Sequence, residues 1–221
     1  MNDTIRFILS LSISFAVLIG IVRFRKIDAA YYPFIYNITA ALVVEIVTRI
    51  FMVNGQPEAF EVALNIYSFL DFYLYLWLFH NWGLFNKNKS VFIALSLTFF
   101  LVWLTNNALV TGFIRPNFYF FILYSFALIF FSVTAFNKAV VNERISIFRN
   151  AKFWICLGII IFYSFFVVAC ATSLTLFRED VSLEFRRGLQ AINVYSNLLV
   201  NLLYAVAVIW VPRKKNFTSL F

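Results

Sequence analysis

The chain has 221 residues, of which 63% are apolar and 21% aromatic, while only 13% are charged. A soluble domain of this length neither buries that much apolar surface nor tolerates it on its outside, so the composition excludes a soluble enzyme or DNA-binding domain. We expect an integral membrane protein. The net charge of +8 is spread over several short connectors, which favours contact with anionic lipid headgroups and argues against a nucleic-acid partner.

A helix needs roughly 20 apolar residues to cross the hydrocarbon core of a bilayer. Seven stretches meet this requirement, and short polar connectors separate them. The expected spans are residues 5–22, 30–53, 60–82, 90–106, 117–137, 152–176 and 188–211. Their apolar runs are continuous and lack the two-residue alternation of a membrane β-barrel. The predicted fold is therefore all-α, a polytopic membrane protein with seven transmembrane helices in one compact bundle over residues 1–221.

The distribution of basic residues predicts the orientation, because Lys and Arg are retained on the cytoplasmic side. With the N-terminus outside, twelve of the 18 basic residues fall on the inner side. The six on the outer side are Arg6, Arg49, Arg115, Arg178, Arg186 and Arg187. We expect the C-terminus in the cytoplasm and the first span to be a retained helix. Short connectors and two cysteines within one span are typical of a bacterial inner-membrane protein.

The second span carries two charged residues in the stretch ALVVEIVTRIF, at Glu45 and Arg49. A charge near the bilayer centre costs about 2.5–3.5 kcal/mol, so it persists where it is paired, faces a cavity or serves a function. The spacing of four residues lets the two side chains neutralise each other. Alternatively, Arg49 extends toward water and Glu45 finds another partner. Either way, this face of the span is expected to turn away from lipid.

The third and seventh spans carry polar stripes at helical spacing. In the third span, the stripe is Glu61, Asn65, Ser68, Asp71 and Tyr75. In the seventh span, it is Asn193, Asn197 and Asn201. The second and third spans run antiparallel through a short connector, so we expect Glu45 and Asp71 to lie at similar depth and to face each other across the bundle.

Two interpretations of these stripes remain open. Polar side chains in membranes form interhelical hydrogen bonds that stabilise by about 0.6 kcal/mol on average. The functional interpretation is a polar cavity, open toward the outside, that binds a small ligand with a polar head and an apolar body. The residues expected to bind this ligand are Glu45, Arg49, Asn65, Asp71, Tyr75, Asn193, Asn197 and Asn201.

Catalytic motifs are absent from the sequence. His80 is the only histidine, which argues against a zinc site, and no nucleophile elbow or Gly-rich phosphate loop occurs among the six glycines. We expect no catalytic residues, no metal and no cofactor.

Three functions are consistent with this pattern. The first is a receptor-like sensor or signalling component that binds its ligand in the cavity and contacts a protein partner through residues 137–152. There Val140, Val141, Ile145 and Phe148 suggest a short amphipathic helix on the membrane surface. The second is a proton- or cation-coupled transporter of a small solute, although the sequence shows no inverted repeat and no broken helix. The third is an intramembrane enzyme that acts on a lipid or isoprenoid through Glu45 and Asp71.

Overall fold

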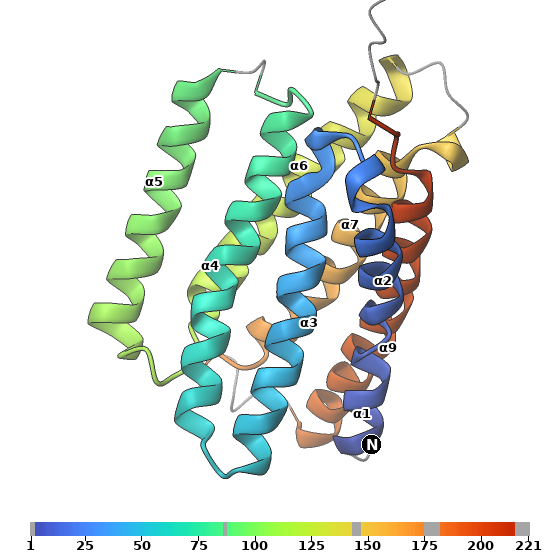
Figure 1. Ribbon diagram of the computed structural model, residues 1–221. Helices are drawn as coiled ribbons and strands as arrows, with labels where there is room; N and C mark the ends of the chain where they lie inside the picture. Colours follow the sequence, from blue (N-terminus) through green and yellow to red (C-terminus); the bar gives the residue numbers. More distant parts are fainter. Residues whose placement is uncertain (1–2, 86–87, 143–146, 175–181, 215–221) are drawn as a thin grey trace, which may run out of the picture.

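The computed structural model describes residues 3–85, 88–142, 147–174 and 182–214, and within this part every long element is a helix (Figure 1). The α-helices are α1 (Asp3–Ser10), α2 (Ile13–Arg23), α3 (Tyr32–Val53), α4 (Pro57–Asn81), α5 (Lys89–Asn106), α6 (Phe118–Asn142), α7 (Ala151–Ala171) and α9 (Leu183–Trp210). Shorter turns are η1 (Phe24–Lys26), η2 (Ala29–Tyr31), the π-helical η3 (Asn107–Thr111) and η4 (Ile147–Arg149).

Seven helical segments of this described part are long and apolar enough to cross a membrane. They are Thr4–Lys26, Ala29–Val53, Pro57–Asn81, Lys89–Val110, Phe118–Val141, Ala151–Ala171 and Glu184–Trp210. The prediction of an all-helical chain with seven helices of membrane-spanning length is confirmed. The helix ends differ from the expected ones by a few residues, because polar residues can continue a helix beyond its apolar part.

The membrane-spanning segments alternate in direction, so helix starts and helix ends lie together at each end of the bundle (Figure 1). The N-terminal end holds the start of α1 and the α3–α4 turn at 54–56. The C-terminal end holds the last turn of α9. Local sequence explains the turns: Pro57 occupies the first turn of α4, where it loses no hydrogen bond, and Gly55 and Gly83 adopt positive φ values of 68° and 75° next to helix ends.

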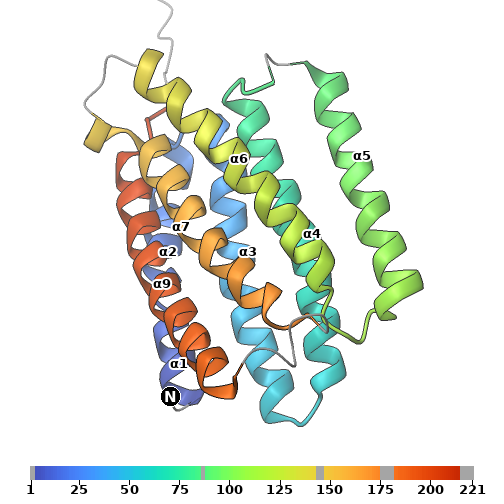
Figure 2. The same cartoon turned by 180° about the vertical axis from the view of Figure 1, so that it is seen from behind.

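Most helices pack into one body, whereas α5 stands at its edge in both views (Figures 1 and 2). No α5 residue is buried, in contrast to the fully buried Phe72 and Leu76 of α4. Aromatic rings attach α5 to α4: Phe99 stacks on Phe72 with ring centroids 4.0 Å apart, and Trp103 lies 5.5 Å from Phe69. The face of α5 away from α4 is apolar, as expected for a helix that contacts lipid.

The first and last spans are joined at the C-terminal end, through α2 and α9. The Arg23 guanidinium donates to the carbonyl oxygens of Val208, Ile209 and Val211 at the end of α9, where helix carbonyls lack a donor four residues further on. Backbone hydrogen bonds extend this junction, from Asp28 to Pro212 at 3.0 Å. The α2–α9 pair is therefore held by charge-assisted bonds as well as by packing.

The first expected span is irregular near its middle. It divides into α1 and α2 at residues 11–12, where backbone bonds shorten to three-residue spacing, from Ser12 N to Leu9 O and from Ser14 N to Leu11 O. Ser12 keeps helical backbone angles of φ −56° and ψ −23°, so the span is tightened at this point and continues as one membrane-spanning segment. A short tightened stretch inside a helix often marks a hinge, and this one lies beside the polar residues described below.

The segment 137–152 also differs from expectation. Val140 and Val141 belong to the last turn of α6, and Phe148 lies in the turn η4, where its ring packs 5.8 Å from that of Phe153. Ile145 lies outside the described residues. Instead of beginning a separate amphipathic helix, the start of this segment prolongs α6, because no residue before Asn142 interrupts helix formation.

Candidate functional site

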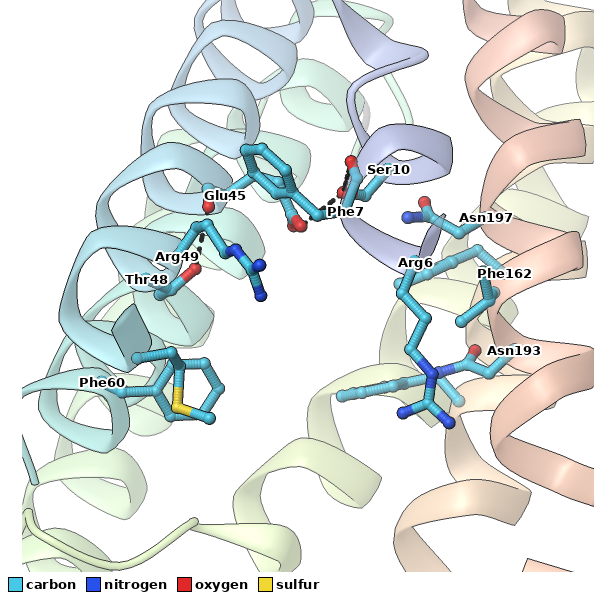
Figure 3. A pocket seen from close by; sticks show the side chains of 13 residues that line it. Arg6, Phe7, Ser10, Glu45, Thr48, Arg49, Phe60, Phe162, Asn193 and Asn197 are labelled. Carbon is cyan, nitrogen blue, oxygen red and sulfur yellow. Dashed lines mark hydrogen bonds between the residues drawn. The ribbon is translucent and has the colours of Figure 1, made fainter. Parts of the chain in front are cut away.

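The N-terminal half of the bundle contains an open cavity of about 390 Å³, which we call the vestibule (Figure 3). It lies between α1, α3 and α9, and side chains of α4 and α7 complete its walls. Its lining residues are Arg6, Phe7, Ser10, Glu45, Thr48, Arg49, Met52, Phe60, Phe162, Phe166, Asn193, Val194 and Asn197. Four of the eight residues expected to bind a ligand therefore lie around one cavity: Glu45, Arg49, Asn193 and Asn197.

Glu45 and Arg49 find their partners on α1. The Ser10 hydroxyl donates to the Glu45 carboxylate, and the Arg49 guanidinium lies over the Phe7 ring, 5.4 Å from its centroid. This arrangement matches the alternative in which Glu45 takes a partner other than Arg49. Since a neutral hydroxyl and an aromatic ring satisfy these groups only in part, both charges remain able to contact a molecule in the vestibule.

Two polar atoms of the vestibule have no hydrogen-bond partner within the described part of the chain. They are Nε of Arg6, a donor, and Oδ1 of Asn193, an acceptor, and both are buried. Figure 3 shows both side chains on the wall opposite Arg49. A buried polar atom without a partner costs about 1–3 kcal/mol, so a bound group that supplies the missing hydrogen bond stabilises this wall.

The asparagines of α9 follow one stripe, as the spacing predicted, but they have different surroundings. Asn193 and Asn197 line the vestibule, and Asn197 also lines a smaller adjoining cavity of about 140 Å³ together with Asn201. The Asn201 amide donates to Ser12 Oγ at 2.9 Å and to Ser10 O at 3.3 Å. Asn201 thus holds the junction between α1 and α2.

Asp71 lies apart from the vestibule, at a buried position in the middle of α4. Its carboxylate accepts hydrogen bonds from Asn37 Nδ2 at 2.7 Å, from the Tyr163 hydroxyl, and from the Tyr67 hydroxyl at 3.5 Å. Asn37 belongs to α3, so its hydrogen bond connects the second span to α4. These interhelical bonds join α3, α4 and α7 around one carboxylate.

Asp71 lines a different cavity of about 360 Å³ between α4, α6 and α7, which we call the aromatic chamber. Its lining residues are Glu61, Leu64, Tyr67, Ser68, Asp71, Pro116, Phe118, Phe121, Tyr124, Phe162, Tyr163, Phe166 and Cys170. Glu45 and Asp71 thus lie on neighbouring cavities. Phe162 is common to the aromatic chamber, the vestibule and the smaller cavity, and Tyr67 is common to the chamber and the smaller cavity.

The two remaining predicted site residues, Asn65 and Tyr75, are also engaged within the protein. Asn65 is fully buried, and its amide donates to Phe113 O at 2.8 Å and Arg115 O at 2.9 Å, so that it anchors the connection before α6. The Tyr75 and Tyr204 hydroxyls lie 3.0 Å apart in the core. For these residues the geometry corresponds to the interhelical hydrogen-bonding interpretation of the stripes.

The prediction did not include several lining residues, of which Arg6, Ser10 and Phe162 are the most informative. Arg6 and Ser10 are four residues apart and share a face of α1, a spacing visible in the sequence. Phe162 offers no such signal, because it stands in a continuous apolar run. Among the described residues, no group of three or more His, Cys, Asp or Glu side chains is placed to hold a metal ion.

No protein-family model, no curated protein and no solved structure matches this chain.

Proposed function

We propose that this protein is a membrane-embedded binding protein that takes a small amphiphile with an anionic head into the vestibule and acts as a sensor or signalling component. The observation that supports this proposal best is the pair of unpartnered buried atoms, Arg6 Nε and Asn193 Oδ1, on the wall of one cavity. A protonated phosphate, which both accepts and donates hydrogen bonds, matches this donor and acceptor together.

The charge of the vestibule favours an anionic head. Arg6 and Arg49 face one carboxylate, Glu45, which leaves a formal excess of one positive charge in its lining. Guanidinium groups bind carboxylates and phosphates through paired hydrogen bonds. The apolar body of the ligand then rests against aromatic walls such as Phe60 and Phe162. A volume of about 390 Å³ falls in the usual range for small-molecule sites.

In this proposal, helix α1 transmits the presence of a ligand in the vestibule to the rest of the bundle. It carries Arg6 and Ser10, and the tightened turn at 11–12 separates it from α2. A ligand that draws Arg6 toward the vestibule changes the position of α1 relative to α9, at the contact made by Asn201. The change reaches the C-terminal end through the α2–α9 junction, and a protein partner docks on the adjacent segment 137–152.

In its cellular setting, the proposed sensor resides in a bacterial inner membrane with the N-terminal end outside, as the distribution of basic residues predicts. The vestibule then opens toward the outside. Binding is favoured over transport because the C-terminal half of the bundle is filled by fully buried side chains, among them Phe34, Leu76 and Ile159. Passage of a solute requires displacement of this core, whereas binding does not.

A titration of the purified protein in nanodiscs tests the proposal, with octyl phosphate as the anionic probe and octanol as its neutral counterpart. We expect octyl phosphate to bind in a saturable manner, and Arg6→Gln and Arg49→Gln each to weaken binding by about tenfold, since each removes a charge-assisted contact. Arg25→Gln, at an exposed position on the far end, is the matched control. Equal binding of octanol, or an equal loss in Arg25→Gln, contradicts the proposal.

Sensing and transport are separated in reconstituted vesicles. A sensor binds octyl phosphate without moving it across the bilayer. Accumulation of octyl phosphate inside vesicles that contain the protein, above the level in protein-free vesicles, contradicts sensing and supports transport.

A further inference from the structure

The aromatic chamber has a lining unlike that of the vestibule. Seven of its lining residues are aromatic, one from α4 and three each from α6 and α7: Tyr67, Phe118, Phe121, Tyr124, Phe162, Tyr163 and Phe166. Two others, Glu61 and Asp71, are carboxylic acids from α4. The described lining contains no Lys, Arg or His. The chamber therefore combines aromatic walls with a formal charge of opposite sign to that of the vestibule.

Neither carboxylate has a cationic partner among the contacts that the structure describes. One oxygen of Glu61, Oε2, is buried and accepts no hydrogen bond within the described residues. Asp71 accepts from Asn37, Tyr67 and Tyr163, which are all neutral donors. A charged carboxylate as buried as that of Asp71 is stabilised by a positive charge nearby, and the neutral donors around it supply none.

We propose that the aromatic chamber is a binding site for an organic cation, a substituted ammonium ion with apolar groups. Aromatic faces attract ammonium groups through their quadrupoles, and this attraction is strongest where water is excluded. Glu61 and Asp71 add the neutralising charge at two positions of the chamber. An anionic ligand is disfavoured by the same two carboxylates, so the chamber and the vestibule select ligands of opposite charge.

The size and walls of the chamber restrict the ligand further. About 360 Å³ holds an ammonium ion with one ring or a short branched chain. A small inorganic cation such as Na⁺ prefers a shell of oxygen ligands, whereas here most of the lining is aromatic carbon. The chamber thus recognises the apolar substituents together with the charge.

The cation site is independent of the proposed function. The aromatic chamber shares the rings of Phe162 and Phe166 with the vestibule but none of its arginines. Experiments can therefore refute ligand binding at one site and still support it at the other.

Benzyltrimethylammonium is a suitable probe, with benzyl alcohol as a neutral and benzenesulfonate as an anionic comparator. Calorimetric titration of the full-length protein in nanodiscs should show saturable binding of the cation and at least about tenfold weaker binding of benzyl alcohol. Benzenesulfonate should not compete with the cation. Absence of saturable binding, or equal affinity for the cation and benzyl alcohol, would overturn the proposal.

Glu61→Gln is the diagnostic variant, because it removes the charge and preserves the shape. We expect an about tenfold loss of affinity. Glu58→Gln is its matched control, since Glu58 lies three residues earlier on α4 at an exposed position. Phe121→Leu removes an aromatic ring from the wall and leaves both carboxylates unchanged. It should weaken binding of the cation roughly threefold to tenfold, and it provides a second test if Glu61→Gln does not fold. Equal losses in both glutamate variants contradict the site.

Arg49→Gln separates this test from that of the vestibule. It should weaken octyl phosphate and leave benzyltrimethylammonium unchanged. Loss of cation affinity in Arg49→Gln places the cation in the vestibule and overturns the proposal.

Discussion

Replacement of Gly158 by alanine probes a close approach between α7 and α9. A Cβ atom at this position would lie 2.4 Å from Cε1 and 3.1 Å from Cδ1 of Tyr204. Carbon atoms pack at about 3.5–4.0 Å, so the ring has to move by roughly 1 Å. Tyr204 has little freedom to do so, because its ring meets Phe34 edge-on at 5.2 Å and its hydroxyl lies 3.0 Å from that of Tyr75.

The expected magnitude follows from three terms. Overpacking of a tight interface costs about 1–3 kcal/mol. Loss of the Tyr75–Tyr204 hydrogen bond adds about 0.6 kcal/mol. The intrinsic preference of helices for alanine over glycine offsets about 0.8–1 kcal/mol of this loss of stability. We therefore expect Gly158→Ala to lower the free energy of unfolding by about 1–3 kcal/mol.

Equilibrium unfolding in mixed micelles of dodecyl maltoside and dodecyl sulfate measures this change. Gly188→Ala is the control, because a Cβ atom there meets nothing within 4 Å and the residue also lies in a helix, α9. It should be neutral or stabilising. A second variant, Tyr204→Leu, should relieve part of the cost of Gly158→Ala by removing the ring that the new methyl group meets. Gly158→Ala with wild-type stability or higher would refute the packing of α7 against α9.

Two further changes test the polar residues that hold the bundle together. Asn65→Ala should reduce the free energy of unfolding by about 2–4 kcal/mol, since it leaves the carbonyls of Phe113 and Arg115 without donors. Unfolding in mixed micelles measures this loss, and Asn54→Ala, at an exposed position, is the control. Equal losses in the two variants would argue against an anchoring role for Asn65. Asn201→Leu should increase hydrogen exchange of the backbone amides at residues 11–15 in mass-spectrometric measurements, because α1 and α2 lose their link to α9; unchanged exchange there would mean that the junction is stable without this amide.

The spans could be predicted because hydropathy over about 20 residues is a property of the chain itself. Periodicity likewise assigned Glu45, Asn193 and Asn197 to inward faces, and the structure places all three around one cavity. In both cases the signal is local: it depends on the spacing of residues within a single helix.

Neighbours across the bundle could not be predicted in this way. Asn65 and Asp71 share a stripe, yet one bonds to the connection before α6 and the other to α3 and α7. Periodicity identifies the face of a helix but not the element that faces it. The tightened turn in the first span could not be predicted for the same reason, because the amide of Asn201, 189 residues away from Ser12, bonds to the chain at this turn.

The existence of the vestibule is tested most directly by the chemical accessibility of its wall. Asn197→Cys should react rapidly with a sulfonated methanethiosulfonate, a membrane-impermeant anion, and octyl phosphate should slow the reaction. Leu199→Cys is the matched position on the same helix, where the wild-type side chain is 49% exposed on the outer surface of the bundle and faces lipid in the proposed setting. The unmodified protein controls for Cys156 and Cys170, both of which are buried. Rapid, ligand-protected labelling at 197 with slow labelling at 199 is the predicted result, and equally slow labelling at both positions would contradict a vestibule between α1, α3 and α9.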